Sequence, residues 1–196
     1  DIAANGLKHI RDIHAPSALA GFGSAKGSNE EAYLFQKLVR TGFGTNNVDH
    51  CTRLCHASSV AALLEGIGSG AVSNQVEDAA LADVIVVIGA NPTDNHPVAA
   101  TFIKNAARRG ATLIVIDPRR NDLSRHADHF LQFRVDTDVA LLNAMIHTII
   151  DEGLVDSDFI ASRTHNFEAL SENVKHFSPE EMAPICGIDA DVIRKT

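Results

Sequence analysis

The sequence lacks the features of several protein classes. Its 196 residues contain three cysteines, an odd number that does not suit a disulfide scaffold and favours a reducing, cytoplasmic setting. No apolar run approaches the roughly 18 residues of a membrane span, and the best candidate, Val84–Gly89, is the size of a strand. Lys and Arg number 17 against 25 Asp and Glu, which gives a formal net charge of −8. We therefore expect no membrane contact and no nucleic-acid partner.

An initiator methionine and a signal-peptide pattern are also missing. The chain begins at Asp1 inside an amphipathic stretch, so we expect a fragment of a longer subunit. Hydrophobic residues make up 45% of the sequence, which is enough for a full-sized core and excludes wholesale disorder. This length predicts one domain or a little more.

Strands alternate with helices along the chain. Residues 17–24 form a small-residue segment that we expect to be a strand, and Ser28 with Glu31 three residues later is a capping box that predicts a helix ending near Gly42. The uninterrupted β-branched run Val84–Ile88 predicts a strand buried on both faces of a parallel sheet.

The same pattern continues in the second half. We expect a helix from about His96 to Arg109, a strand at Thr112–Ile116, a strong helix at Val139–Asp151 and several short helices after it. The predicted fold class is α/β, with a doubly wound, mainly parallel sheet, helices on both faces and a C-terminal helical cluster. We expect residues 1–196 to form a single Rossmann-like domain, with residues 153–196 as its helical extension.

Three predicted strand ends are polar and rich in turn residues, at 21–27, 89–96 and 117–120. The first fits neither phosphate-binding fingerprint, since its third glycine comes one residue late and no GK[ST] follows. Asp117 directly follows a strand, where a carboxylate can accept from a ribose hydroxyl or a purine amino group, and Arg119 and Arg120 suit a diphosphate. A nucleotide-like ligand is one interpretation. A turn capped by Asp117 and two solvated arginines is the other.

The most unusual segment is 49–59, in which His50, Cys51, Cys55 and His56 fall within seven residues. A zinc site is one reading, but the Cys-x3-Cys spacing is not that of a zinc finger and no second pair follows. Two half-buried cysteines without chemistry are another. A catalytic pair fits better, because a cysteine entering a helix is a good ligand or nucleophile and a histidine can exchange protons. We expect Cys186 to pack as a small apolar residue.

Residues 44–56 closely resemble the active-site segment of molybdenum- or tungsten-dependent formate dehydrogenases, which use bis-molybdopterin guanine dinucleotide. Other stretches resemble the same family in the same order along nearly the whole chain. They are Ser28-Asn29-Glu30-Glu31 with Gln36-Lys37, Gly89-x-Asn91-Pro92 with His96-Pro97, Asp117-Pro118-Arg119, and Thr137-Asp138 with residues 140–145. The ordered set is more specific than any single motif.

This resemblance implies roles for individual residues. Cys55 stands at the position of the metal-ligating cysteine or selenocysteine, and thiolate suits a soft metal. His56 stands at the position of the histidine that handles the formate proton. The candidate cofactor-binding residues are Gly23, Asn91, Asp94, Asn95, Asp117, Arg119 and Asp138. Asp138 lies in a variant of the family's Pro-Gly-Thr-Asp motif, in which Val135-Asp136 replaces Pro-Gly.

The implied activity is oxidation of formate to carbon dioxide, or the reverse, at a bis-pterin molybdenum or tungsten centre. The resemblance also implies a [4Fe-4S] cluster in an N-terminal part of the subunit, further domains of that subunit and electron-transfer subunits as partners. A fragment of this size is expected to be inactive alone. Two alternatives remain: another molybdopterin oxidoreductase, such as a nitrate reductase, and a stand-alone nucleotide- or zinc-binding module. The Cys55-His56 pair argues against the nitrate reductase, since those enzymes tend to carry methionine after the cysteine.

Overall fold

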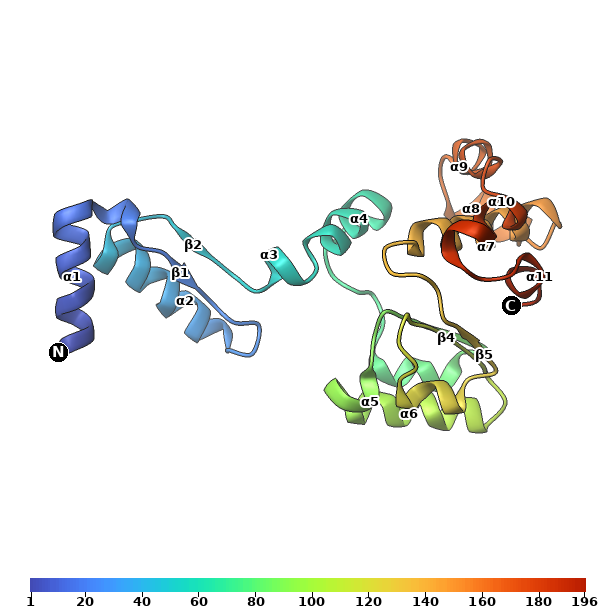
Figure 1. The fold of residues 1–196 in the computed structure, drawn as a ribbon, viewed down its shortest axis with the longest axis horizontal. Coiled ribbons are helices and arrows are strands. Elements are labelled where there is room, and N and C mark those ends of the chain that lie inside the picture. The colour runs from blue at the N-terminus through green and yellow to red at the C-terminus, as the bar shows by residue number, and fades with distance from the viewer. The chain divides into compact units, whose positions relative to one another are not determined.

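The computed structural model describes residues 1–196, and their contacts divide the chain into two compact units, Asp1–Ser73 and Asn74–Thr196. Each unit contains its own parallel strands and its own helices (Figure 1). The prediction of a single domain over residues 1–196, with 153–196 as its extension, stays a prediction.

The first unit is built around a short parallel pair of strands. Gly21 of β1 pairs with Val48 of β2, and Phe22 pairs with Asp49. The elements of this unit are α1 (Ile2–His14), a 3-10 turn η1 (Pro16–Ala18), β1 (Gly21–Phe22), α2 (Asn29–Lys37), η2 (Leu38–Phe43), β2 (Val48–Asp49), α3 (Thr52–Cys55) and α4 (Ala57–Ile67).

The capping box predicted at the start of α2 is confirmed. The Ser28 hydroxyl accepts from the Glu31 N–H at 3.2 Å, and the Glu31 carboxylate accepts from the Ser28 N–H at 2.6 Å. At its other end α2 continues into η2, which is a π-helical turn, and this turn ends at Gly44 with φ 77°. The helical path therefore runs past Gly42, and glycine takes the left-handed conformation that stops it.

The second unit contains three parallel strands in the order β3-β4-β5. β3 (Val84–Ile88) and β4 (Thr112–Ile116) pair along their whole length, and β5 (His129–Leu131) pairs with the second half of β4. The other elements are η3 (Val76–Leu81), α5 (Pro92–Asn95), α6 (Pro97–Arg108), η4 (Asp122–His126), α7 (Asp138–Asp151), α8 (Ser157–Arg163), α9 (Phe167–Val174), α10 (Pro179–Cys186) and α11 (Ala190–Lys195).

Alternate residues of β4 enter two different cores. Leu113 and Val115 pack with Leu123 and with residues of α6, while Ile114 and Ile116 pack with residues of α7, α10 and α11. Because helices cover both faces of this parallel sheet, the predicted α/β class with a doubly wound sheet is confirmed. The short helices expected in the last forty residues are present as α8–α11.

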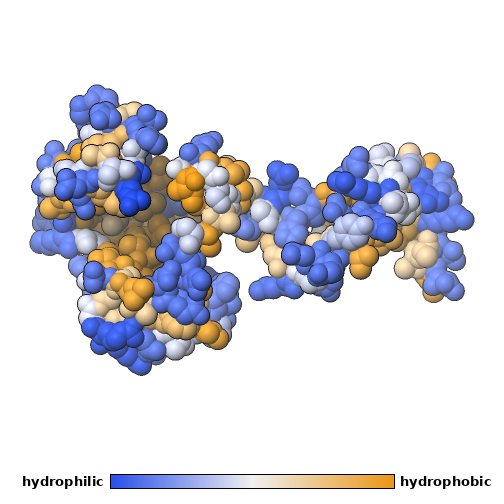
Figure 2. All heavy atoms as spheres, turned by 180° about the vertical axis from the view of Figure 1, so that it is seen from behind, coloured by the Kyte–Doolittle hydropathy of each residue, from blue (hydrophilic) through white to orange (hydrophobic).

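Two strand predictions are wrong in detail. The strand expected over residues 17–24 is reduced to Gly21–Phe22, because Pro16 starts a 3-10 turn that occupies its first part. β3 is not buried on both faces, since it lies at the edge of its sheet and leaves Val84 56% and Val86 49% exposed. Figure 2 shows apolar residues at the surface of the molecule as orange patches.

Candidate functional site

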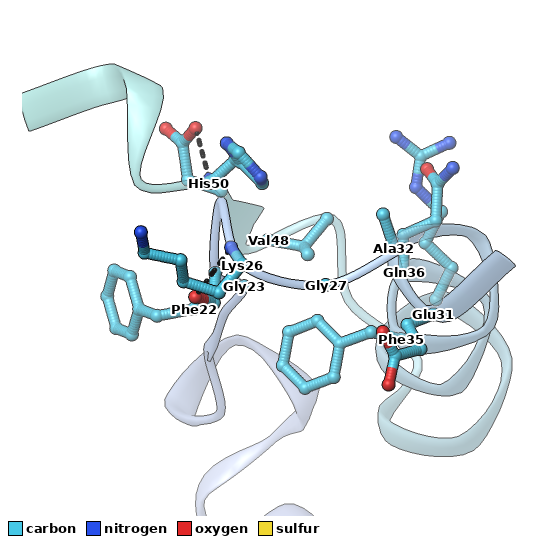
Figure 3. Close-up of a pocket in the computed structure, with 13 residues that line it drawn as sticks. Phe22, Gly23, Lys26, Gly27, Glu31, Ala32, Phe35, Gln36, Val48 and His50 are labelled. Atoms are coloured by element: carbon cyan, nitrogen blue, oxygen red, sulfur yellow. Dashed lines mark hydrogen bonds between the residues drawn. The ribbon is translucent and has the colours of Figure 1, made fainter. Parts of the chain in front are cut away.

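In the first unit, a cavity of about 740 Å³ lies where β1 and β2 end. Gly23 and Lys26 from the loop after β1, Gln36 from α2, and His50 after β2 are among its lining residues. In Figure 3, Phe35 and Gln36 of α2 lie across from His50 and Lys26. Gly23 is one of the predicted cofactor-binding residues. Its N–H donates to the Asp49 carbonyl at 2.9 Å, so it continues the backbone pairing of β1 and β2 beside the cavity.

The acidic side chains that line this cavity have hydrogen-bond partners, whereas two of its basic side chains have none. Glu31 is held by the capping box, and the Asp49 carboxylate accepts from Arg53 Nε at 2.9 Å. The N–H of His50 and then the Arg53 guanidinium lower the pKa of Asp49. The side chains of Lys26 and Arg40 form no hydrogen bond and no ion pair in the structure. In Figure 3, Lys26 lies beside Gly23. The cavity therefore offers free positive charge to an anionic group.

Cys55 is the last residue of α3, and His56 connects this single turn to α4. The Cys55 N–H donates to the Cys51 carbonyl at 2.9 Å, and the His56 carbonyl accepts from the Val60 N–H at 2.9 Å. Sequence reasoning expects the cysteine at the entry of a helix; instead it closes one short helix directly before the next. Both Cys55 and His56 are exposed, and the Cys55 thiol is free.

The cysteine and histidine side chains of segment 49–59 do not form a metal site of their own. No group of three or more His, Cys, Asp or Glu side chains is arranged to hold a metal ion. A structural zinc site needs about four protein ligands, so the zinc-binding alternative has no ligand set here.

The candidate residues after β3 lie within one turn. Asn91 donates from Nδ2 to the Asp94 carboxylate at 2.7 Å and accepts from the Thr93 hydroxyl at 2.5 Å. Asn95 Oδ1 lies 2.8 Å from Nδ1 of His96. The structure therefore brings Asp94 and Asn95 of α5 together with Asn91, the residue before this helix, at the carboxyl end of β3, where open parallel sheets bind ligands.

Asp117 has a structural role that the sequence left open. Its side chain is nearly buried, in a residue only 7% exposed, and accepts from the Arg119 N–H at 2.7 Å and from Asn121 Nδ2 at 3.3 Å. The same Asn121 amide donates to the Ala90 carbonyl at 3.3 Å and so joins the loops after β3 and β4. Sequence reasoning missed Asn121, whose only signal was a short polar side chain in a turn.

The arginines after Asp117 differ from one another. The Arg120 guanidinium lies 5.1 Å from the centroid of the Phe130 ring, a cation–π contact that holds it against the sheet. The Arg119 side chain is exposed and forms no hydrogen bond or ion pair, so its guanidinium is free to meet an anion.

Asp138 is the first residue of α7 and lies exposed after β5. Its carboxylate accepts from the Val139 N–H at 3.2 Å. Two residues earlier, Asp136 adopts φ 65°, the left-handed conformation that favours glycine and that Asp tolerates better than most residues. The loop after β5 is also tied to the loop after β4, because Gln132 Nε2 donates to the Pro118 carbonyl at 3.0 Å.

Known proteins share the sequence pattern of this chain over nearly its whole length. The pattern of the molybdopterin oxidoreductase family matches residues 1–185. The chain is 43% identical over 193 residues to the F420-dependent formate dehydrogenase subunit alpha of Methanocaldococcus jannaschii and 42% identical over 193 residues to formate dehydrogenase H of Escherichia coli, covering 98% of this chain in both cases. It spans 28% and 27% of those proteins.

A solved structure has the same fold. Acetylene hydratase from Pelobacter acetylenicus superimposes with a TM-score of 0.76 over 98% of this chain and 26% of its own, with 28% sequence identity. No helix of the present structure has the length and apolar character needed to cross a membrane. Together, the family pattern over residues 1–185, the closely related sequences and the shared fold establish that the chain belongs to the molybdopterin oxidoreductase family.

Proposed function

We propose that the chain is part of the catalytic subunit of a molybdenum- or tungsten-dependent formate dehydrogenase, in which Cys55 is the metal ligand. The observation that carries this proposal is the exposed, free Cys55 thiol followed directly by His56, within a segment that resembles the active site of those enzymes. Two relatives named formate dehydrogenases, each more than 40% identical over almost the whole chain, support it.

The chemistry is the loss of one proton and two electrons from formate, with breakage of its C–H bond and release of carbon dioxide. The bound bis-molybdopterin guanine dinucleotide supplies the two-electron acceptor. Cys55 would hold the metal through its thiolate, and the neighbouring His56 would receive the proton. The resemblance implies that a [4Fe-4S] cluster in an N-terminal part of the subunit and electron-transfer subunits would be the route by which the electrons leave. The cytoplasmic location of the protein stays a prediction.

Three polar loops of the second unit are suited to one guanine dinucleotide portion. Asn91, Asp94 and Asn95 offer amide and carboxylate groups at the start of α5 and along it, and Arg119 offers a free guanidinium for phosphate. The Asp117 carboxylate accepts hydrogen bonds from residues of its own turn, so we propose that it contributes by holding this loop in shape. Asp138 at the start of α7 completes the set. In the first unit Gly23 allows close approach of a ligand to the backbone in the cavity that Lys26 lines.

The test compares cysteine variants of the full catalytic subunit. We expect Cys55→Ser to abolish formate-dependent reduction of an artificial electron acceptor, because serine replaces the soft thiolate with a hard oxygen donor. Cys51→Ser, on the same turn, and Cys186→Ala, in the core, are the matched controls and should keep the activity. Formate oxidation that persists in Cys55→Ser refutes the assignment. Turnover of nitrate with none of formate in the unmodified subunit would instead favour a nitrate reductase.

A further inference from the structure

Cys55 lies on a helical turn that has little stability of its own. α3 contains four residues, and its backbone bonds run from the N–H groups of Arg53, Leu54, Cys55 and His56 back to the carbonyls of His50, Cys51 and Thr52. A helix this short has not repaid the entropy cost of its first turn. The Cys51 side chain gives no capping bond, and Leu54 is 95% exposed, so hydrophobic packing of that side chain does not hold the turn either. Groups next to the turn must therefore fix it.

The His50 side chain supplies such a group. Its Nδ1 accepts from the Thr52 N–H at 3.3 Å and lies 3.0 Å from the Thr52 hydroxyl. In the tautomer that carries its proton on Nε2, Nδ1 is the acceptor for this backbone N–H. The Thr52 hydroxyl lies within reach of the same Nδ1 atom. The ring thus satisfies the first free N–H of α3, as the side-chain oxygen of an N-cap residue does.

The His50 ring is itself held in place by the two strands. β2 fixes the backbone before it, because Asp49 pairs with Phe22 and accepts the Gly23 N–H through its carbonyl. The Asp49 carboxylate accepts from the His50 N–H at 2.8 Å. A methyl group placed on Gly23 would lie 3.7 Å from Cδ2 of His50, so the ring lies against the backbone at the end of β1.

We propose that His50 is a positioning residue, which transmits the fixed geometry of the β1–β2 pair to the turn that presents Cys55. This inference rests on the proposed role of Cys55 as metal ligand. Nδ1 of His50 orients the Thr52 N–H, and the Asp49 carboxylate holds the Arg53 side chain on the same turn at 2.9 Å. Both contacts tie the start of the Thr52–Cys55 turn to β2, and the thiol is presented at its end. Loss of the acceptor loosens the turn without removing any ligand of the metal.

The variants His50→Asn and His50→Gln distinguish the loss of the Nδ1 hydrogen bond from the loss of the imidazole ring itself. Asn carries an oxygen that can accept from the N–H two residues further on, as in an Asx-turn, and so reproduces the bond made by Nδ1. Gln has the same amide one methylene further out, where this short-range bond is lost. We therefore expect His50→Asn to behave like the unmodified subunit and His50→Gln to be impaired. His9→Gln, on exposed α1, is the matched control.

The primary readout is hydrogen exchange of backbone amides in the full subunit without its cofactor, followed by mass spectrometry of peptides that cover residues 48–60. In His50→Gln the amides of α3 should exchange about fivefold faster, the effect of one net hydrogen bond, while His50→Asn and His9→Gln leave them within about twofold of the original rate. Equal exchange in the Asn and Gln variants overturns the proposal.

The second readout is formate oxidation by the loaded subunit. We expect His50→Gln to lower kcat about fivefold with little change of KM, and His50→Asn to restore it. Equal kcat values in the two variants would contradict the positioning role even if Cys55→Ser is inactive. If Cys55→Ser retains activity, the proposed function fails, and the exchange measurement still decides whether His50 holds the turn.

Discussion

A methyl group added at Gly21 should destabilise the strand pair on which the cysteine segment depends. The Cβ of an alanine there would lie 2.5 Å from Cγ2 of Val39 and 3.0 Å from Cζ of Phe35. Val39 is completely buried, so its side chain has no free space into which to move. Overpacking of this kind costs typically about 1–3 kcal/mol, and we expect Gly21→Ala to lower the free energy of unfolding of the first unit by that amount.

Tyrosine fluorescence during urea unfolding measures this effect in the right part of the chain. The sequence has no tryptophan and one tyrosine, and this residue, Tyr33, lies on α2 of the first unit. Gly23→Ala is the matched control, because its new Cβ would have Asp49 O as nearest neighbour at an ordinary 3.6 Å. Adding Val39→Ala to Gly21→Ala should recover part of the loss, with a coupling of about 0.5–3 kcal/mol. Strictly additive losses, or an unaltered Gly21→Ala variant, would show that the close approach does not exist.

Two further perturbations test the helix ends. Ser28→Ala removes one half of the capping box of α2 and should cost the first unit about 1 kcal/mol in the same urea assay, whereas Ser28→Thr should cost much less. In the second unit, the hydrogen bonds from Arg194 and then the N–H of Glu180 lower the pKa of Glu180. A lowered carboxyl pKa stabilises the fold above the ordinary glutamate pKa, and this contribution is lost as pH falls through the lowered value. Arg194→Met should therefore lower Tm near neutral pH and flatten its acid dependence; unchanged Tm–pH profiles would contradict this reasoning.

The sequence predicted those elements that local chemistry determines. The β-branched runs 84–88 and 112–116 became β3 and β4 with the expected bounds, and the Ser28–Glu31 capping box starts α2 as predicted. The edge position of β3 could not be predicted, because it depends on which strands pair and not on composition. The first predicted strand failed because the 3-10 turn at Pro16 competed with it.

The candidate site was predictable in its residue types but not in its connections. Cys55 and His56 stand out in the sequence, yet their location between two helices depends on the turn that His50 and Asp49 fix. Asp117 was correctly identified as a residue of the strand end, but whether its carboxylate serves the turn or a ligand depends on Asn121, four residues away. Hydrogen bonds of this kind depend on the backbone geometry of the loop, which the spacing of residues in the sequence does not predict.

The π-helical turn at Leu38–Phe43 has a consequence for how related sequences are aligned. A π-turn holds one more residue than an α-turn over the same stretch of helix, so a residue can be lost there without shifting the elements on either side. The number of residues between the start of α2 and the cysteine segment is therefore not fixed by the fold. Relatives that are one residue shorter between Lys37 and Gly44 can present their cysteine in the same place, and a motif search with a rigid spacing would overlook them.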